Sequence, residues 1–195
     1  MRGSRTRRPA ARYNRMTAAI RQAAAAEIGK HRRLLRSGRD DRILSALMLP
    51  QLWLATPAGY GVPTTTGRKT GRPRHKCVPV IQRGDRAYLV ALRLSHIAVI
   101  SPTAVQAWVH NIRANPNVRL RIRGGDFDGV AREITGTGER ERARELLCST
   151  VFPTDYGECA LHLRGLPTRT KVQELHRYWF ETEIPIAIDL KEIRP

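Results

Sequence analysis

A cluster of basic residues between two short apolar segments is the part of this sequence best suited to bind a ligand. Residues 68–76 carry five positively charged side chains and no acid, and Gly67 and Gly71 allow the backbone to turn tightly. The backbone N–H groups of such a turn, together with Lys69 and Arg74, can make charge-assisted hydrogen bonds to a phosphodiester or a carboxylate. The segment therefore predicts an anion-binding turn, and the alternative is a solvated basic hairpin tip.

A second motif gives this turn a context. Residues 108–118 read Trp-Val-His-Asn-Ile-Arg-Ala-Asn-Pro-Asn-Val, and Ile-Pro-Ile occurs at residues 184–186. These segments, with TTTGRKTGRPR at residues 64–74, resemble the deazaflavin-dependent nitroreductase family, also described as quinone reductases that use reduced coenzyme F420. The resemblance covers about residues 62–190. It implies a split β-barrel of the FMN-binding type whose cofactor is a deazaflavin, coenzyme F420.

The resemblance also implies which residues contact the coenzyme. Lys69 and Arg74 would hold its phosphate and acidic tail, and Trp108 would form a wall of the pocket. Asn111 would fix its helix to the neighbouring turn. Packing alone favours a core position for Trp108, and the two roles are compatible. The expected cofactor-binding residues are Lys69, Thr70, Gly71, Arg74, Lys76, Cys77, Ala91, Arg93, Trp108 and Asn111.

Two segments depart from the family pattern. The family has a glycine-rich turn with a basic residue after its second strand, where the coenzyme passes, but residues 92–95 here read Leu-Arg-Leu-Ser. The missing glycines put a close approach of the backbone to the coenzyme in question. The tyrosine-rich segment on the family's substrate side is reduced to Phe-Pro-Thr-Asp-Tyr at residues 152–156, and residues 157–171 resemble an insertion. FMN, a tetrapyrrole or a lipid is therefore the alternative ligand for the same fold.

The reaction that the resemblance implies is hydride transfer to an activated acceptor, such as a quinone, an enone or a nitro compound, with the cofactor supplying the reactivity. A proton donor must then meet the anion that forms on the acceptor. We expect Tyr156 in this catalytic role, with His176 or Ser95 as substitutes; the competing interpretation of Tyr156 is a packing residue. No metal site is expected, because the three cysteines form no CxxC pair and the six histidines are scattered.

The elements that must position these residues follow from periodicity and turn signals. Alternating apolar residues predict hairpins, and apolar residues at helical spacing predict helices. The expected strands are 77–82, 86–94, 118–123, 127–133 and 184–190, and the expected helices are 17–36, 43–54 (or a covering loop), 139–151, 168–181 and one from Ser101 or Thr103 to 114, with 152–167 irregular. This order indicates an α+β protein, mainly β, in which helices pack on a small antiparallel barrel.

Charge is distributed unevenly along the 195 residues. The formal net charge is +18, and residues 1–42 hold thirteen Arg or Lys against three acids. We therefore expect a basic, partly disordered and partly helical extension at residues 1–55, followed by the barrel domain at residues 56–195. Residues 1–54 could contact an anionic membrane, although the apolar stretch 43–54 is too short to span a bilayer. We further expect a cytoplasmic location, a small-molecule acceptor and a homodimer.

Nucleic-acid binding is the alternative from another class of function. Residues 70–76 resemble the Gly-Arg-Pro core of an AT-hook, which lies in narrow A·T minor grooves, and the basic first 42 residues would add phosphate contacts. Against it, the segment is a single copy that leads directly into an expected strand. DNA binding therefore ranks below the reductase.

Overall fold

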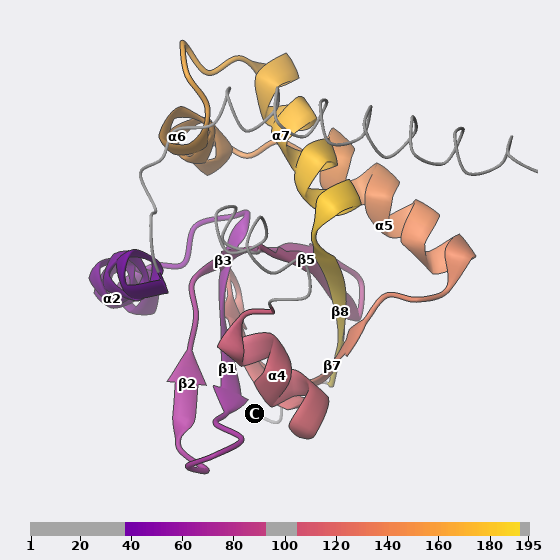
Figure 1. The fold of residues 1–195 in the computed structure, drawn as a ribbon. Helices are drawn as coiled ribbons and strands as arrows, with labels where there is room; N and C mark the ends of the chain where they lie inside the picture. Colours follow the sequence, from indigo (N-terminus) through magenta and orange to yellow (C-terminus); the bar gives the residue numbers. More distant parts are fainter. Residues whose placement is uncertain (1–37, 93–104, 192–195) are drawn as a thin grey trace, which may run out of the picture.

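An antiparallel sheet with five helices around it makes up the described part of the computed structural model, residues 38–92 and 105–191 (Figure 1). The strands are β1 (Tyr60–Thr66), β2 (Pro73–His75), β3 (Val78–Pro79), β4 (Ile81–Arg83), β5 (Arg86–Ala91), β6 (Asn117–Ile122), β7 (Gly125–Glu133) and β8 (Ile184–Leu190). The helices are α2 (Gly38–Leu54), α4 (Ala107–Ala114), α5 (Thr137–Ser149), α6 (Pro153–His162) and α7 (Arg169–Thr182).

A bend in one stretch of chain closes the sheet into a barrel. The strands follow the order β2-β1-β6-β7-β8-β5-β4, and every pairing is antiparallel. β4 pairs with β5 at one end of this path, while β3, separated from β4 only by Val80, pairs with β1. Residues 78–83 thus join the two sides of the sheet, with the Val80 N–H donating to the Gly59 carbonyl at 2.8 Å. The result is a split barrel with packed helices, which confirms the predicted α+β, mainly β fold.

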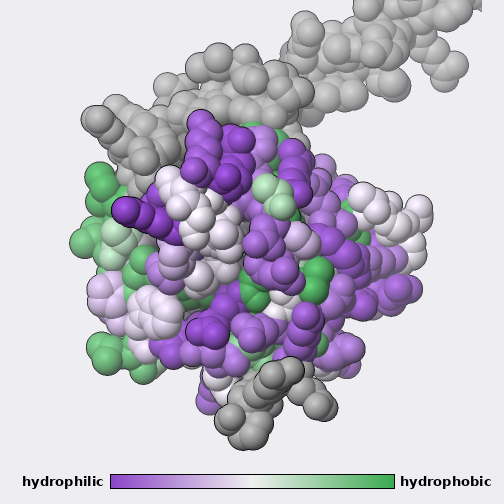
Figure 2. All heavy atoms as spheres, turned by 90° about the horizontal axis from the view of Figure 1, so that it is seen from below, coloured by the Kyte–Doolittle hydropathy of each residue, from purple (hydrophilic) through white to green (hydrophobic). Residues whose placement is uncertain are grey.

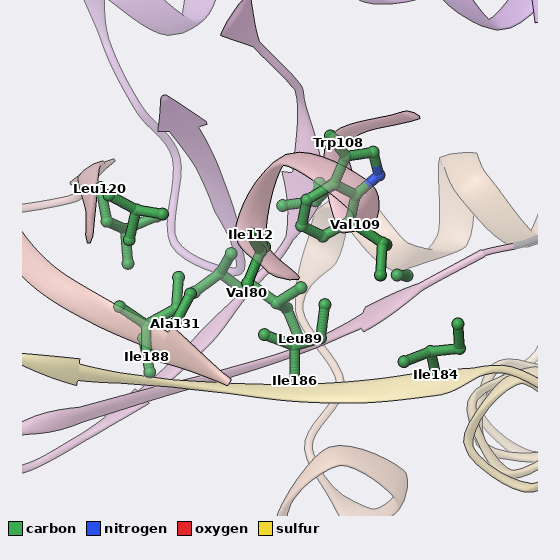
Figure 3. Packing of buried hydrophobic residues seen from close by; sticks show 14 of the residues in the cluster. Val80, Leu89, Trp108, Val109, Ile112, Leu120, Ala131, Ile184, Ile186 and Ile188 are labelled. Atoms are coloured by element: carbon green, nitrogen blue, oxygen red, sulfur yellow. The ribbon is translucent and has the colours of Figure 1, made fainter. Parts of the chain in front are cut away.

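The interior of the barrel is filled by side chains that alternate along the strands, because successive residues of a strand point to opposite faces. Leu120, Ile186 and Ile188 are fully buried there. Helix α4 covers this interior with the side chains of Trp108, Val109 and Ile112 (Figure 3).

Helices α5, α6 and α7 form a second layer on the outer face of β5 and β8 (Figure 1). Beneath them, Tyr88 and Ala187 of the sheet join Leu147 and Phe180 of the helices in a separate apolar cluster. β8 is therefore buried on both faces, which explains why its sequence is apolar almost throughout.

Helix α2 lies beside the β1–β2 hairpin and faces it with Ser45 and Leu52, which are both buried. Near its end, the Trp53 ring lies 4.3 Å from the Arg121 guanidinium carbon and makes an edge-on contact with the His75 ring. The expected boundary between extension and barrel near residue 55 stays a prediction.

Most of the expected elements occur, with shifts at their ends. The expected helix at 43–54 is part of α2, and the described residues of the 77–94 and 118–133 segments each form a hairpin, the first with its leading strand divided into β3 and β4. Residues 93 and 94 lie outside the described residues. Helix 17–36 and the caps Ser101 and Thr103 lie outside the described residues, and α4 is described from Ala107 onwards.

The irregular segment expected at 152–167 is wrong, because it contains helix α6. Pro153 occupies the first helical position, where its missing N–H costs nothing. The Phe152 N–H donates to Asp155 Oδ2 at 2.6 Å and so satisfies one of the free groups at the helix start. Only Asp155 and Cys159 of α6 are buried, so the helix has no long apolar stripe that periodicity could reveal.

Candidate functional site

The basic turn expected to bind an anion is a preformed hairpin loop between β1 and β2. Thr64 pairs with His75 and Thr66 with Pro73 at its base. Within the loop, the Gly67 carbonyl accepts from the N–H groups of both Thr70 (3.1 Å) and Gly71 (2.7 Å). Gly71 has a φ of 66°, which glycine adopts without strain. Both sequence and structure therefore make this a rigid turn.

Asn111 connects this turn to helix α4. Its side chain is buried, its Oδ1 accepts from the Arg68 N–H at 3.1 Å, and its Nδ2 donates to Thr65 Oγ1 at 3.2 Å. Both ends of the amide are thus used inside the protein. The side chain holds the helix against the turn, as its expected positioning role requires.

The expectation that the backbone of the turn binds the ligand is wrong for most of its N–H groups. They are engaged inside the protein at five positions: Gly67, Arg68, Thr70, Gly71 and Arg72. Compact loops satisfy their own backbone groups, because an unpaired N–H costs free energy when water is excluded. An anion at this turn must therefore be held mainly by side chains.

The side chains suited to this task are the four exposed cations of the turn: Arg68, Lys69, Arg72 and Arg74. Among the residues that the structure describes, no carboxylate forms an ion pair with any of them. On the barrel, by contrast, Arg132 pairs with both Glu139 and Asp189. Within the described part of the chain, the positive charge of the turn is therefore not neutralised by an acid.

The other expected cofactor-binding residues lie in several environments. Lys76 Nζ donates to Ser45 Oγ at 3.2 Å and Cys77 Sγ lies 3.5 Å from the Ser45 carbonyl oxygen, so both contact α2. Ala91 is buried at the end of β5, and Trp108 is buried in the barrel core, where its indole N–H donates to the Gln106 side chain. Thr70 and Gly71 are exposed on the turn, and Arg93 lies outside the described residues.

A pocket lies between the barrel and the helical layer. Its walls are mostly apolar, and its polar groups come from α6 and α7. The lining residues are Gly59, Pro79, Ile81, Val90, Leu92, Leu147, Phe152, Asp155, His176 and Trp179. Leu92 directly follows β5 and is the last described residue before position 93, in the segment 92–95 where the resemblance places the middle of the coenzyme. The pocket and the expected path of the coenzyme therefore meet at this residue.

Titratable groups gather at one side of this pocket. Asp155 Oδ2 lies 4.0 Å from His176 Nε2, and burial raises the pKa of Asp155 and lowers that of His176. Glu158 follows on α6; burial raises its pKa to about 7, against the effect of its hydrogen bond with the Tyr60 phenol. Burial also raises the pKa of Tyr60. Burial therefore shifts the pKa of each of these groups in the direction that favours its neutral form.

Tyr156 does not line the pocket, although it packs in a cluster with Val90, Leu92 and Trp179, which do. It is half-buried on α6, which lies at the opposite end of the molecule from the β1–β2 turn (Figure 1). Because neighbouring residues of a helix point about 100° apart, the same helix that turns Asp155 toward the pocket turns Tyr156 away. Of the substitutes, His176 lines the pocket and Ser95 lies outside the described residues.

Periodicity and motif spacing missed Asp155, Glu158 and Tyr60 as site residues. The signal that could have identified Asp155 is its position three residues after Phe152 in a Phe-Pro-x-Asp helix start. Nothing local connects Tyr60 to Glu158, because their contact joins the first strand to a helix about one hundred residues later.

Comparisons with known proteins identify the family of this chain. Residues 57–169 match the family described as F420H(2)-dependent quinone reductase. Structures with a similar fold include an F420-H2 dependent reductase, FDR-A, at 20% identity over 68% of this chain and 94% of that chain, with a TM-score of 0.44. They also include the heme storage protein HutZ from Vibrio cholerae (14% identity, 76% and 91%, TM-score 0.40) and an FAD-binding protein from Mesorhizobium loti (14% identity, 76% and 91%, TM-score 0.39). The family match, which spans more than half of the chain, confirms the resemblance: this protein belongs to the F420H(2)-dependent quinone reductase family and is an oxidoreductase whose cofactor is F420.

Proposed function

We propose that this F420-dependent oxidoreductase reduces a small activated acceptor of the quinone, enone or nitro class in the pocket beneath α6 and α7. The observation that carries the proposal is the composition of the pocket, which has aromatic and aliphatic walls and one polar end. Small flat molecules bind in such pockets through apolar contact, and a few polar groups orient them. Phe152 and Trp179 supply the aromatic surface, and Asp155 and His176 supply the polar end.

The unpaired cations of the β1–β2 turn fit the anionic part of F420. Lys69 and Arg74, with Arg68 and Arg72 beside them, would hold its phosphate and its acidic tail through charge-assisted hydrogen bonds. When bound in its reduced form, F420 supplies a hydride. The protein supplies the position of the acceptor, a wall that excludes water, and a proton donor. Thr70, Gly71, Lys76, Cys77, Ala91, Arg93, Trp108 and Asn111 stay proposed contacts or supports of the coenzyme.

A binding titration tests the role of the turn. The double variant Lys69→Ala and Arg74→Ala removes two unpaired charges from it, so F420 should bind about tenfold more weakly or worse, a loss of about 1.4 kcal/mol. Fluorescence titration of F420 measures the dissociation constant. The matched control is Arg123→Ala with Arg142→Ala, which removes two exposed arginines elsewhere. Equal affinity in the two double variants would refute a specific grip by the turn.

The alternative ligands predict other results in the same titration. If FMN or a tetrapyrrole occupied the barrel, it would give its own visible absorption band when added to the purified protein. DNA would bind with an affinity that falls steeply as salt increases. The structure argues against an AT-hook, because residues 73–75 form strand β2, paired with β1, and so do not provide a free extended segment.

We also propose peripheral contact with an anionic membrane through the extension at residues 1–54. Helix α2 supports it with Ile43, Leu47 and Leu54, which lie on one face and are 59%, 70% and 89% exposed. Figure 2 shows apolar surface at the side of the molecule where α2 lies in Figure 1. None of the described helices is long and apolar enough to cross a membrane.

A homodimer and a cytoplasmic location stay proposals, to be tested by light scattering and by cell fractionation.

A further inference from the structure

The polar end of the pocket contains a histidine whose hydrogen position is set by its surroundings. His176 Nδ1 lies 3.1 Å from the carbonyl oxygen of Leu147. A carbonyl oxygen only accepts hydrogen bonds, so Nδ1 carries a hydrogen. The other ring nitrogen, Nε2, lies 4.0 Å from Asp155 Oδ2. Any proton that His176 gains or releases is therefore exchanged at Nε2, on the side of the ring that faces Asp155.

Asp155 is held in place opposite this nitrogen. Its side chain is 3% exposed, and its Oδ2 accepts from the Phe152 N–H at the start of α6. With a hydrogen on Nδ1, a neutral His176 ring has its lone pair on Nε2, on the side of the carboxyl group. If Asp155 is ionised at the same time, two hydrogen-bond acceptors face each other with no hydrogen between them, which is unfavourable. At 4.0 Å the two groups are too far apart for a direct hydrogen bond, but the charge of each affects the titration of the other. A proton that either group binds would lie at the wall of the pocket.

The groups around this pair come from three elements. Glu158 lies one turn further along α6, and Tyr60 contacts it from β1. From the end of α5, the carbonyl of Leu147 faces the ring, and the carbonyl of Thr150 just beyond α5 does so too. A negative charge on Glu158 would favour retention of the proton by Asp155, because Asp155 and Glu158 repel each other when both are ionised.

We propose that His176 and Asp155 donate a proton to the oxygen of the acceptor, and that the pocket takes a flat apolar molecule with a carbonyl or quinone oxygen at this end. The inference rests on the proposed function and adds the donor and the orientation of the acceptor. Reduction adds a hydride to the acceptor and leaves an electron pair on its oxygen. The O–H bond forms as the Nε2–H bond breaks, and the pair then regains a proton from water.

A binding experiment without coenzyme tests the orientation. 2-Methyl-1,4-naphthoquinone is titrated into the protein, and tryptophan fluorescence is measured, because Trp179 lines the pocket. We expect saturable quenching that Trp179→Phe largely removes, and a dissociation constant about fivefold higher in His176→Phe, since the quinone oxygen loses a hydrogen-bond donor. Quenching of the same size and affinity in both variants and in the unaltered protein would overturn the placement.

Steady-state kinetics with reduced F420 and the same quinone test the donor. His176→Gln should lower kcat about tenfold or more while KM changes about threefold or less. It should also remove any pH dependence of kcat that arises from titration of His176 and Asp155. Asp155→Asn keeps an acceptor for the Phe152 N–H but no longer stabilises the imidazolium. It should lower the titration midpoint of His176, read by NMR of histidine-labelled protein without coenzyme. This variant keeps the test valid even if His176→Gln fails to fold.

The control is His110→Gln, which replaces a partly buried histidine on α4 that does not line the pocket. If the unaltered protein neither binds F420 nor reduces the quinone, the proposed function fails. If it does both, and His176→Gln and Asp155→Asn retain its kcat and its pH profile, only the donor pair fails. Loss of kcat in His110→Gln to the same extent would also overturn the assignment.

Discussion

Asn111 uses both ends of its side-chain amide on the β1–β2 hairpin. The donor end contacts Thr65 Oγ1 and the acceptor end contacts the Arg68 N–H, both in a buried position. It carries no charge for a ligand, so its contribution to coenzyme binding must come through the shape of the turn. A substitution of Asn111 therefore alters the geometry of the turn while the charge of the turn stays the same.

The variant Asn111→Ala removes both hydrogen bonds, one with the buried Thr65 hydroxyl and one with the part-buried Arg68 N–H. We expect the free energy of unfolding to fall by about 1–3 kcal/mol, and F420 to bind more weakly although no positive charge is lost. Urea denaturation and F420 titration measure the two effects. Asn115→Ala, at the end of the same helix and without contact to the turn, is the control. Undiminished F420 affinity in Asn111→Ala would show that the turn holds its shape alone.

Glu158 makes a second prediction at this scale, on stability against pH. Burial raises its pKa to about 7 in the folded protein, above the ordinary glutamate value, so the folded state binds this proton more tightly. Its favourable contribution is complete below the unfolded pKa and is lost as pH rises toward about 7. Glu158→Gln should therefore gain stability relative to the unaltered protein as pH increases, by up to about 3 kcal/mol at about pH 8. Urea titrations at both ends of this range measure it; a constant difference between the two proteins would contradict it.

Helix α2 is an element with two unequal faces. Ser45 and Leu52 face the barrel, whereas Ile43, Leu47 and Leu54 face outward on the opposite side. An outward apolar stripe on a chain of net charge +18 fits a surface that combines anionic headgroups with acyl chains. Helix α6 shows the converse case: few of its residues are buried, yet those few include an acid of the pocket.

Vesicle binding tests the outward face of α2. Leu47→Glu should lower binding to phosphatidylglycerol vesicles about fivefold or more, because it places a charge in the apolar stripe and adds repulsion. Gln51→Glu, on the same helix and equally exposed to solvent, adds the same charge without removing apolar surface and should have a smaller effect. Co-sedimentation gives the bound fraction. If both variants lost vesicle binding equally, the added charge and not the removed apolar surface would be the cause. Absence of vesicle binding by the unaltered protein would refute the proposal.

At the scale of the whole molecule, one bent strand segment and one doubly buried strand hold the fold together. Residues 78–83 close the barrel, and β8 separates the interior of the barrel from the helical layer that forms the pocket. The cations of the turn and the acids of the pocket therefore belong to different ends of one barrel (Figure 1). Loss of packing in β8 should affect both ends together.

A matched pair of substitutions tests this dependence on β8. Ile188→Ala, at a fully buried position, should lower the free energy of unfolding by about 2–5 kcal/mol through lost contact and a residual cavity. Ile43→Ala, on the exposed face of α2, should change it by about 0.5 kcal/mol or less. Chemical denaturation followed by circular dichroism compares the two. A similar decrease in the free energy of unfolding in both variants would mean that packing around β8 contributes no more to stability than the exposed face of α2.

The sequence by itself determined the family, the basic turn and the hairpins, because these depend on short-range patterns. Local structure of this kind is set by residues close together in the sequence: glycines, alternating apolar residues and the 108–118 motif. It therefore depends little on how the rest of the chain folds. The positions of the Gly67–Arg72 loop and of strand β8 were predictable for this reason.

Only the tertiary structure decided which groups of the turn and of α6 are exposed on the turn or line the pocket. The loop amides turn inward because Asn111, more than forty residues away, and the loop itself satisfy them. Asp155 reaches the pocket and Tyr156 does not, because an unrecognised helix sets their directions. Tyr60, Asp155 and His176 come from one strand and two helices, and contacts between such distant segments depend on packing of the whole chain, which local spacing does not encode.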